Sequence, residues 1–275
     1  GRNMAAKVTE INCDTFMLTD RLIRVNQFVL SGSEKSLLID TGYGGEKFLR
    51  TVKKLASLPL IVANTHLHPD HSDGNYLFDR IYVGAPDLPE NGMPSNILAR
   101  SVADFYRTHS SLPKALIAKA EKFGIIRTGK EEYLPMPEKF DLGGRTVRTL
   151  ACPGHTPGCT LFLDERDKAV YAGDTINPAF WAFTAQSLTL ASYADVWEGL
   201  KAELAGFEKI YISHHSKPLD MGYADAFIEN LRTLRAADGK PSFIKGGTLE
   251  PVYIYKKHNA TYGDMAVWAY PSQVG

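Results

Sequence analysis

One short segment of the chain combines residue types that bind metal ions. It holds three histidines and one aspartate within six residues: His66, His68, Asp70 and His71. Imidazole nitrogens and carboxylate oxygens are ligands that suit zinc, iron and manganese. In an extended chain His66 and His68 point to the same side, and Pro69 then turns the chain so that Asp70 and His71 face a second point nearby. We therefore predict that this loop contributes ligands to two metal ions.

Further ligands must come from elsewhere, because zinc takes four or five ligands and a catalytic site keeps one position for water. Three candidates follow expected strands: His155, Asp174 and His214. Glycine and proline on both sides of His155 predict a tight loop that presents one imidazole. A histidine or aspartate at a strand end is often only a turn residue. These three residues are candidate ligands because they occur together in a chain that also has the histidine-rich motif.

The elements that position these residues can be read from the pattern of apolar residues. A strand over residues 36–39 ends at Asp40, and a helix over 46–58 and a strand over 60–63 lead into the histidine-rich loop. Ligand sites of α/β proteins lie at the carboxyl ends of strands, as this loop does. A short helix is expected within residues 72–85, ahead of a strand over 81–85. The other expected strands are 11–18, 23–30, 139–142, 146–151, 161–163, 169–171, 209–213, 252–255 and 266–270, and further helices are expected over 193–205 and 223–237.

Strands with hairpins, interrupted by helices, occur twice along the chain. This order predicts an α/β protein, a four-layer αββα sandwich of two mixed sheets with outer helices. Residues 4–275 are expected to form a single domain. Residues 86–137 contain several prolines and two expected helices, 95–109 and 114–123. We interpret this segment as an inserted helical cap, because it is too short to bury a good core alone.

Composition argues against nucleic acid and membranes as partners, and a small-molecule substrate is the partner we expect. Lys and Arg number 31, as do Asp and Glu, so the net charge is zero and the basic excess of nucleic-acid-binding domains is missing. No run of about 18 apolar residues predicts a membrane span. Three cysteines without a paired pattern and an N-terminus without the apolar segment of a signal peptide favour the cytoplasm. A homo-oligomer remains open.

The order of the candidate residues resembles the motifs of the metallo-β-lactamase-fold superfamily, the αββα metallo-hydrolases. That family has a strand-end aspartate, then HxHxDH, then a lone histidine, a bridging aspartate and a final histidine. The matching residues are Asp40, His66, His68, Asp70, His71, His155, Asp174 and His214. The resemblance covers residues 8–230 and is closest in motif to glyoxalase-II-like and lactonase-like members.

The resemblance implies a dinuclear site with two divalent ions, of which zinc is the first choice and iron or manganese the alternatives. One ion would take His66, His68 and His155, and the second would take Asp70, His71 and His214. Asp174 would bridge the two ions, and Asp40 resembles the outer carboxylate that steadies a ligand histidine. His215 follows His214 directly, so the final ligand is ambiguous by one residue.

The function implied is hydrolysis, with a metal-bridging hydroxide that attacks an ester, a thioester or a lactone of a small molecule. Asp70 would be both ligand and catalytic proton shuttle. A phosphodiesterase or another phospho- or sulfo-ester hydrolase is the alternative, whereas β-lactamase activity is less expected because the best-known branch has Cys at the position of Asp174. A di-iron redox protein is disfavoured because such relatives usually carry Glu at the position of His68. A non-catalytic binding module is disfavoured because such members typically lose ligands.

The aromatic residues Phe180, Trp181 and Phe183 follow Asp174 closely. They are either ordinary core residues or the wall of a pocket, because a loop after a metal ligand is a natural place for one. His215 is a further candidate for the pocket.

Overall fold

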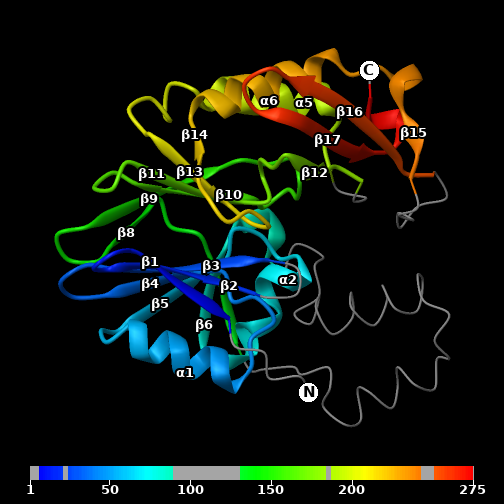
Figure 1. Ribbon diagram of the computed structural model, residues 1–275. Helices are drawn as coiled ribbons and strands as arrows, with labels where there is room; N and C mark the ends of the chain where they lie inside the picture. The colour runs from blue at the N-terminus through cyan, green and yellow to red at the C-terminus, as the bar shows by residue number, and fades with distance from the viewer. Residues whose placement is uncertain (1–5, 21–23, 89–130, 184–186, 243–250, 275) are drawn as a thin grey trace, which may run out of the picture.

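The computed structural model describes residues 6–20, 24–88, 131–183, 187–242 and 251–274. Two sheets pack face to face, with α1 outside the first sheet and with α5 and α6 on the far side of the second (Figure 1). The predicted αββα arrangement is therefore confirmed. The helices are α1 (Glu46–Leu55), α2 (Pro69–Ser72), α5 (Leu190–Leu200) and α6 (Gly222–Thr233).

The first sheet follows the chain order from β1 to β7. Its strands are β1 (Lys7–Asn12), β2 (Thr15–Thr19), β3 (Asn26–Ser31), β4 (Ser36–Ile39), β5 (Leu60–Ala63), β6 (Arg80–Val83) and β7 (Glu132–Pro135). Strands β1 to β4 pair antiparallel, and β4 to β7 pair parallel. The single strand predicted over residues 11–18 is wrong, because the chain turns at Cys13 and Asp14 and divides it into β1 and β2.

The second sheet has the strand order β14-β13-β11-β10-β9-β8. Its strands are β8 (Lys139–Asp141), β9 (Thr146–Ala151), β10 (Thr160–Asp164), β11 (Ala169–Gly173), β13 (Lys209–Ile212) and β14 (Leu219–Asp220). Only β11 and β13 run parallel in this sheet of the described chain. The carboxyl ends of β11 and β13 thus reach the same edge of the second sheet.

Alternating side chains divide the apolar residues between two layers of core. Along β4, Leu37 and Ile39 pack between the two sheets with Phe162 and Tyr171, whereas Leu38 packs toward α1 against Val52. All four residues of β4 are buried, as expected for a strand covered on both faces. This strand leads directly to Asp40, so a rigid element holds one edge of the candidate site.

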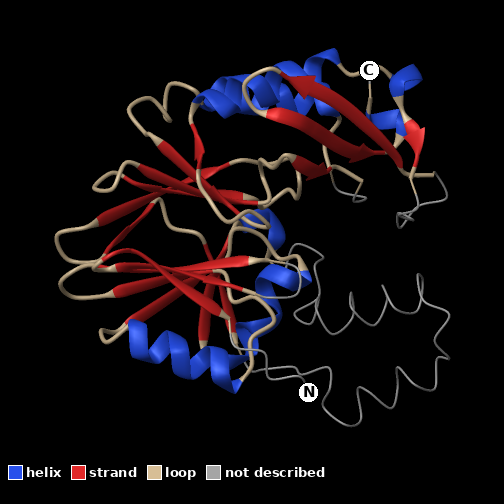
Figure 2. Ribbon diagram, viewed as in Figure 1, coloured by secondary structure: helices blue, strands red, loops and turns tan. Residues whose placement is uncertain are grey.

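A third sheet, which the sequence pattern did not predict, lies beside the second sheet. It has the order β12-β17-β16-β15, with the strands β12 (Ala179–Trp181), β15 (Lys240–Pro241), β16 (Tyr253–Asn259) and β17 (Gly263–Ala269). Helices α5 and α6 cover one face of this sheet (Figure 2). Tyr255, Met265 and Val267 share one buried cluster with Phe227 of α6.

The expected cap over residues 86–137 falls largely outside the described residues, and so do both of its expected helices. At its carboxyl end the structure has a strand instead of part of a cap. Glu132–Pro135 pairs in parallel with β6 and extends the first sheet. The expectation of a single domain over residues 4–275 remains a prediction.

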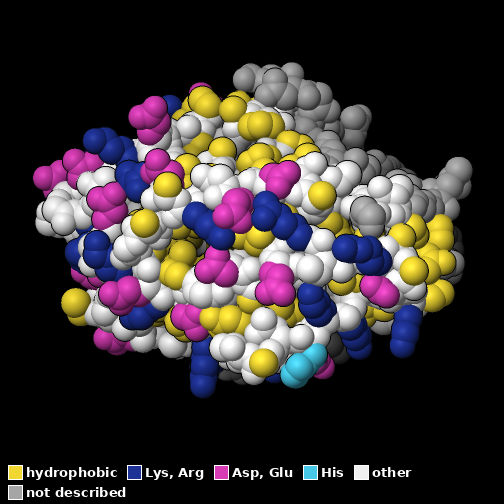
Figure 3. Space-filling model, turned by 90° about the horizontal axis from the view of Figure 1, so that it is seen from above, with side chains coloured by type: hydrophobic (Ala, Val, Ile, Leu, Met, Phe, Trp, Pro, Cys, Tyr) yellow, Lys and Arg dark blue, Asp and Glu magenta, His cyan; other side chains and the backbone are white. Residues whose placement is uncertain are grey.

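Charged residues of both signs intermingle on the face above α5 and α6 (Figure 3). Arg232 of α6 contacts Asp195 of α5 at 3.0 Å, and Lys201 contacts Asp225 at 2.7 Å. None of the helices in the described ranges has the length and hydropathy that a bilayer span requires.

Candidate metal centre

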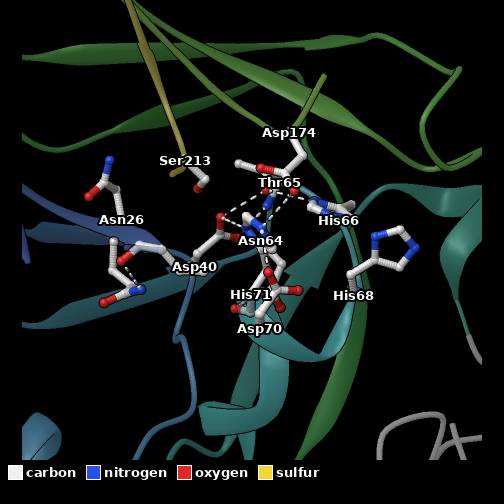
Figure 4. A network of polar contacts seen from close by, with 12 residues as sticks. Asn26, Asp40, Asn64, Thr65, His66, His68, Asp70, His71, Asp174 and Ser213 are labelled. Carbon is white, nitrogen blue, oxygen red and sulfur yellow. Dashed lines mark hydrogen bonds and ion pairs between the residues drawn. The ribbon is translucent and has the colours of Figure 1, made fainter. Parts of the chain in front are cut away.

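The predicted ligands meet between the two sheets, at the carboxyl ends of several strands. Asp40 follows β4, the histidine-rich loop follows β5, Asp174 follows β11 and the segment Ser213–His214 follows β13. Figure 4 shows Asp174 pointing from the second sheet toward the residues of the first. The loop between β9 and β10 adds His155.

His66, His68 and His155 form a first group, in which one nitrogen of each ring lies within 4.8 Å of the others. His155 Nε2 lies 2.9 Å from His68 Nδ1. His68 is extended with φ −64° and ψ 147°, and α2 begins at Pro69, as expected for a residue that precedes proline. The proline therefore ends the extended segment after His68 and turns the chain, as predicted.

Asp70, His71, Asp174 and His214 form a second group. Asp174 Oδ2 lies 3.4 Å from His71 Nε2 and 3.4 Å from His214 Nε2. Asp70 Oδ2 lies 3.4 Å from His214 Nε2 and 3.7 Å from His71 Nε2. Asp174 Oδ2 is also 3.9 Å from His155 Nε2, so this carboxylate lies between the two groups.

The donor spacing of the second group fits a single metal ion. Ligand atoms about 2.1 Å from one ion lie about 3.4 Å apart in a tetrahedron. The four donor-to-donor distances in the second group are 3.4 to 3.7 Å. Among the described residues, His66 Nε2, His71 Nε2 and Asp174 Oδ1 are buried without a hydrogen-bond partner. Such atoms normally have a partner, and a metal ion would supply it.

Three of the candidate ligand histidines are oriented through their Nδ1 atoms. His66 Nδ1 lies 3.1 Å from Thr65 Oγ1, His71 Nδ1 lies 2.8 Å from Asp40 Oδ2, and His155 Nδ1 lies 2.7 Å from the carbonyl oxygen of Trp181. A proton on Nδ1 satisfies each contact and leaves the Nε2 lone pair for the site. Outer partners of this kind fix the tautomer of metal-binding histidines.

Asp40 organises the loop that carries the motif. Its carboxylate accepts hydrogen bonds from the Thr65 amide, from Thr65 Oγ1 and from His71 Nδ1, each at 2.8 Å. Asp40 has a positive φ of 63° and is buried. Aspartate tolerates that backbone region better than most residues, and the three hydrogen bonds hold it there.

The turn that carries His214 is held by the neighbouring sheet. His214 has φ 61°, and its amide donates to the carbonyl of Arg24 at 2.9 Å. Asn26 of β3 donates to the carbonyls of Ile212 and His215 at 2.8 and 2.7 Å. These contacts direct His214 toward the carboxylates, while His215 Nδ1 contacts the Lys217 carbonyl at 2.8 Å. The geometry thus favours His214 over His215 as the final candidate ligand.

Burial and charge act differently on the two groups. Burial lowers the pKa of His68 to about 3 and lowers the pKa of His66 and His155, so these rings are neutral and can bind a metal. Burial also opposes protonation of His71, but the nearby carboxylates, that of Asp174 above all, raise its pKa well above the usual value. The second group is therefore rich in negative charge, which attracts a cation.

The structure also places the aromatic residues predicted for a pocket. Phe180 is buried in the core beneath α5 and α6, with its ring 6.0 Å from that of His155, so it is not an exposed pocket wall. Trp181 is 47% exposed, and its carbonyl contacts His155. Phe183 is half-buried, with its ring 5.0 Å from that of Trp181.

The residues that support the loop were missed by the sequence analysis. Thr41 Oγ1 donates to Asn75 Oδ1, and Asn75 donates to Asn64 Oδ1, both at 2.8 Å. Asn64 donates to the His71 carbonyl at 3.2 Å. Position is the one signal that could have found Thr41, Asn64 and Thr65, because each adjoins Asp40 or the motif. Nothing in the sequence around Asn26 or Trp181 indicates that either residue supports the candidate site.

The sequence model that defines the metallo-beta-lactamase superfamily matches residues 21–240, which is most of the chain. The chain belongs to the metallo-beta-lactamase superfamily. The solved metallo-beta-lactamase from Pontibacter korlensis covers 83% of the chain, with a TM-score of 0.56 and 18% identity, and all of that chain is matched. This likeness concerns the fold.

Two curated relatives are more similar in sequence. Glyoxylase B2 of Dictyostelium discoideum is 26% identical over 64% of this chain and 56% of its own length. The human acyl-coenzyme A thioesterase MBLAC2 is 28% identical over 56% of this chain and 58% of its own length. The chain thus spans little more than half of these relatives. Family membership and the two groups of histidines and aspartates together indicate that the chain binds divalent metal.

Proposed function

We propose that the protein is a hydrolase with two divalent metal ions, most simply zinc, that cleaves a thioester, an ester or a lactone of a small molecule. The observation that carries this proposal is the position of Asp174 Oδ2, which lies 3.9 Å from His155 Nε2 of the first group and 3.4 Å from His71 Nε2 of the second. One carboxylate within reach of both groups is suited to link two ions.

In this proposal the first ion is held by His66, His68 and His155. The second ion is held by the other predicted ligands: Asp70, His71 and His214. Asp174 is shared by the two ions. Bound divalent metal supplies a Lewis acid for the substrate oxygen and lowers the pKa of a water molecule from 15.7 to about 7.

The chain's own groups have separate tasks. Asp40 holds His71, and the Trp181 carbonyl holds His155, so both rings keep their Nε2 atoms toward the site. Asp70 keeps 22% of its side chain exposed, and its carboxylate can accept a proton and pass it to the leaving group. His214 is 31% exposed, so the substrate approaches from this side.

A thioester is the first bond to test, because a curated relative is named as an acyl-coenzyme A thioesterase. A cysteine nucleophile is disfavoured, since burial raises the pKa of the Cys159 thiol well above its usual value. A cytoplasmic location is part of the proposal, in keeping with three cysteines that form no disulfide.

The test is metal content together with hydrolysis. We expect about two metal ions per chain in zinc-loaded protein, and loss of one ion and of thioester hydrolysis in His71→Ala. The matched control is His258→Ala, because His258 is exposed and its ion pair is with Asp264, which is also exposed. Protein that binds no metal after zinc loading, or a His71→Ala variant with unchanged metal content and activity, contradicts the proposal.

A further inference from the structure

The carboxyl-terminal hairpin of β16 and β17 follows residue 240, where the superfamily match ends. It nevertheless pairs with β12, so that Trp181 is opposite Trp268. The Ala182 amide donates to the Trp268 carbonyl, and the Ala266 amide donates to the Pro178 carbonyl, both at 2.7 Å. Strand β12 therefore owes its position to a part of the chain outside the family match.

Strand β12 adjoins the candidate metal centre. The Trp181 carbonyl accepts the hydrogen bond of His155 Nδ1 at 2.7 Å. Because the backbone of Trp181 contacts a predicted ligand, the third sheet begins at the metal centre and extends away from it. Side chains on β12 are therefore close to the site where the reacting part of a substrate would bind.

The two faces of the third sheet differ. One face, with Phe180 and Val267, packs in the core beneath α5 and α6. Side chains alternate along a strand, so the opposite face carries Trp181 and Trp268. Ile254 of β16 is opposite Trp268 and shares that face. Trp181, Trp268 and Ile254 thus form one line across three neighbouring strands, which we call the apolar row.

The apolar row is partly accessible to solvent and ends at a charged residue. Trp181 is one of the exposed large apolar side chains of the described residues, with Val8 and Tyr43. The Trp181 and Trp268 rings are 6.4 Å apart, and three strands span about 10 Å. Beyond Ile254 the register continues to Lys240, which is exposed. Trp268 and Ile254 are half-buried. A partly exposed apolar row beside a polar centre is typical of ligand-binding sites.

We propose that the apolar row binds the acyl chain of the substrate, and that the row selects chains of medium length over an acetyl group. The location of the row beside His155 supports this assignment, because the acyl carbon that is attacked lies at the metal centre. Lys240 at the far end limits the apolar contact to about 10 Å. That the acyl chain belongs to a cleaved substrate rests on the proposed function, whereas the affinity of the row for an acyl chain does not.

The test is calorimetric titration of the 275-residue, zinc-loaded chain with octanoate and with acetate. We expect tighter binding of octanoate than of acetate, and octanoate binding about tenfold weaker in Trp181→Ala and in Trp268→Ala. Trp181→Ala keeps the carbonyl that contacts His155. The matched control is Val8→Ala, which removes an exposed apolar side chain from β1 and leaves octanoate binding unchanged.

Two results overturn the inference: octanoate that binds no more tightly than acetate, or tryptophan variants that bind octanoate as the unmodified chain does. Circular dichroism shows whether each variant is folded. The two substitutions lie on different strands, so if one variant does not fold, octanoate binding by the other still tests the inference. Hydrolysis of acetyl and octanoyl thioesters separates the two proposals. If neither is cleaved while octanoate binding depends on the tryptophans, thioester hydrolysis is excluded from the proposed function and the assignment of the row to an acyl chain stands.

Discussion

Asp40 Oδ2 accepts a hydrogen bond from His71 Nδ1 at 2.8 Å, and both side chains are buried. The carboxylate fixes the ring so that His71 Nε2 faces Asp70 and Asp174. A residue that binds no metal itself thus sets the geometry of the second candidate ion site.

Asp40→Asn retains the size of the side chain but removes its charge. We expect the affinity for the second metal ion to fall by about 10- to 100-fold, as found when the outer partner of a ligand histidine is changed. Competition with a chromogenic chelator measures this affinity. Asp141→Asn is the control, because Asp141 is exposed in β8 on the second sheet. Equal zinc affinity in Asp40→Asn and the unmodified chain would contradict the role given to Asp40.

Gly173 precedes Asp174 with φ 55°, and an added Cβ would collide with the Thr65 side chain. Gly173→Ala therefore combines backbone strain with a clash, and we expect a loss of more than about 2 kcal/mol in the free energy of unfolding. Gly144→Ala is the matched control, since Gly144 has φ 65° and no atom within 4 Å of the added Cβ. Urea denaturation measures both variants, and equal losses would exclude the clash.

The three thiols differ in reactivity. Cys13 is exposed, whereas Cys152 and Cys159 are buried. Burial raises the pKa of Cys152 to about 12 and that of Cys159 well above its usual value. At pH 8 a thiol reagent should therefore modify one cysteine per folded chain and all three in denaturant. Cys13→Ser should reduce the folded count to zero. Rapid modification of a second cysteine in the folded chain would contradict the buried positions.

Two carboxylates near the buried Arg145 link stability to pH. The hydrogen bond from Arg166 lowers the pKa of Asp14, and the pKa of Asp167 is lowered as well, because hydrogen bonds from Arg166 and Asn12 outweigh burial. A lowered pKa stabilises the fold above the unfolded value of about 3.9, and this stability is lost as the pH falls through the folded pKa. Asp14→Asn should therefore lower the urea midpoint at pH 6 more than at pH 3. The same difference at both values would show that charge is not involved.

Much of the fold could be predicted from local pattern. Strands β4 and β5 lie where the apolar runs placed them, over Ser36–Ile39 and Leu60–Ala63, since a short apolar run between turn residues has few alternatives. The third sheet was not predicted, because β12 is only three residues long and is held by β17, whose Trp268 pairs with Trp181 from 87 positions further along the chain.

The sequence by itself determined which side chains are candidate metal ligands and to which family the chain belongs. The histidine-rich motif lies within six residues, and at that distance chain geometry alone brings the side chains near each other. The order of the later residues pointed to the same superfamily, which the family match over residues 21–240 confirms.

Only the tertiary structure decided which distant groups meet. The orientation of His214 rather than His215 depends on Asn26, and the orientation of His155 depends on the Trp181 carbonyl. These contacts arise from the packing of one sheet against another and from the register of β12 with β17. Such registers are set by the summed burial of the whole core, and no local pattern of residues carries that information.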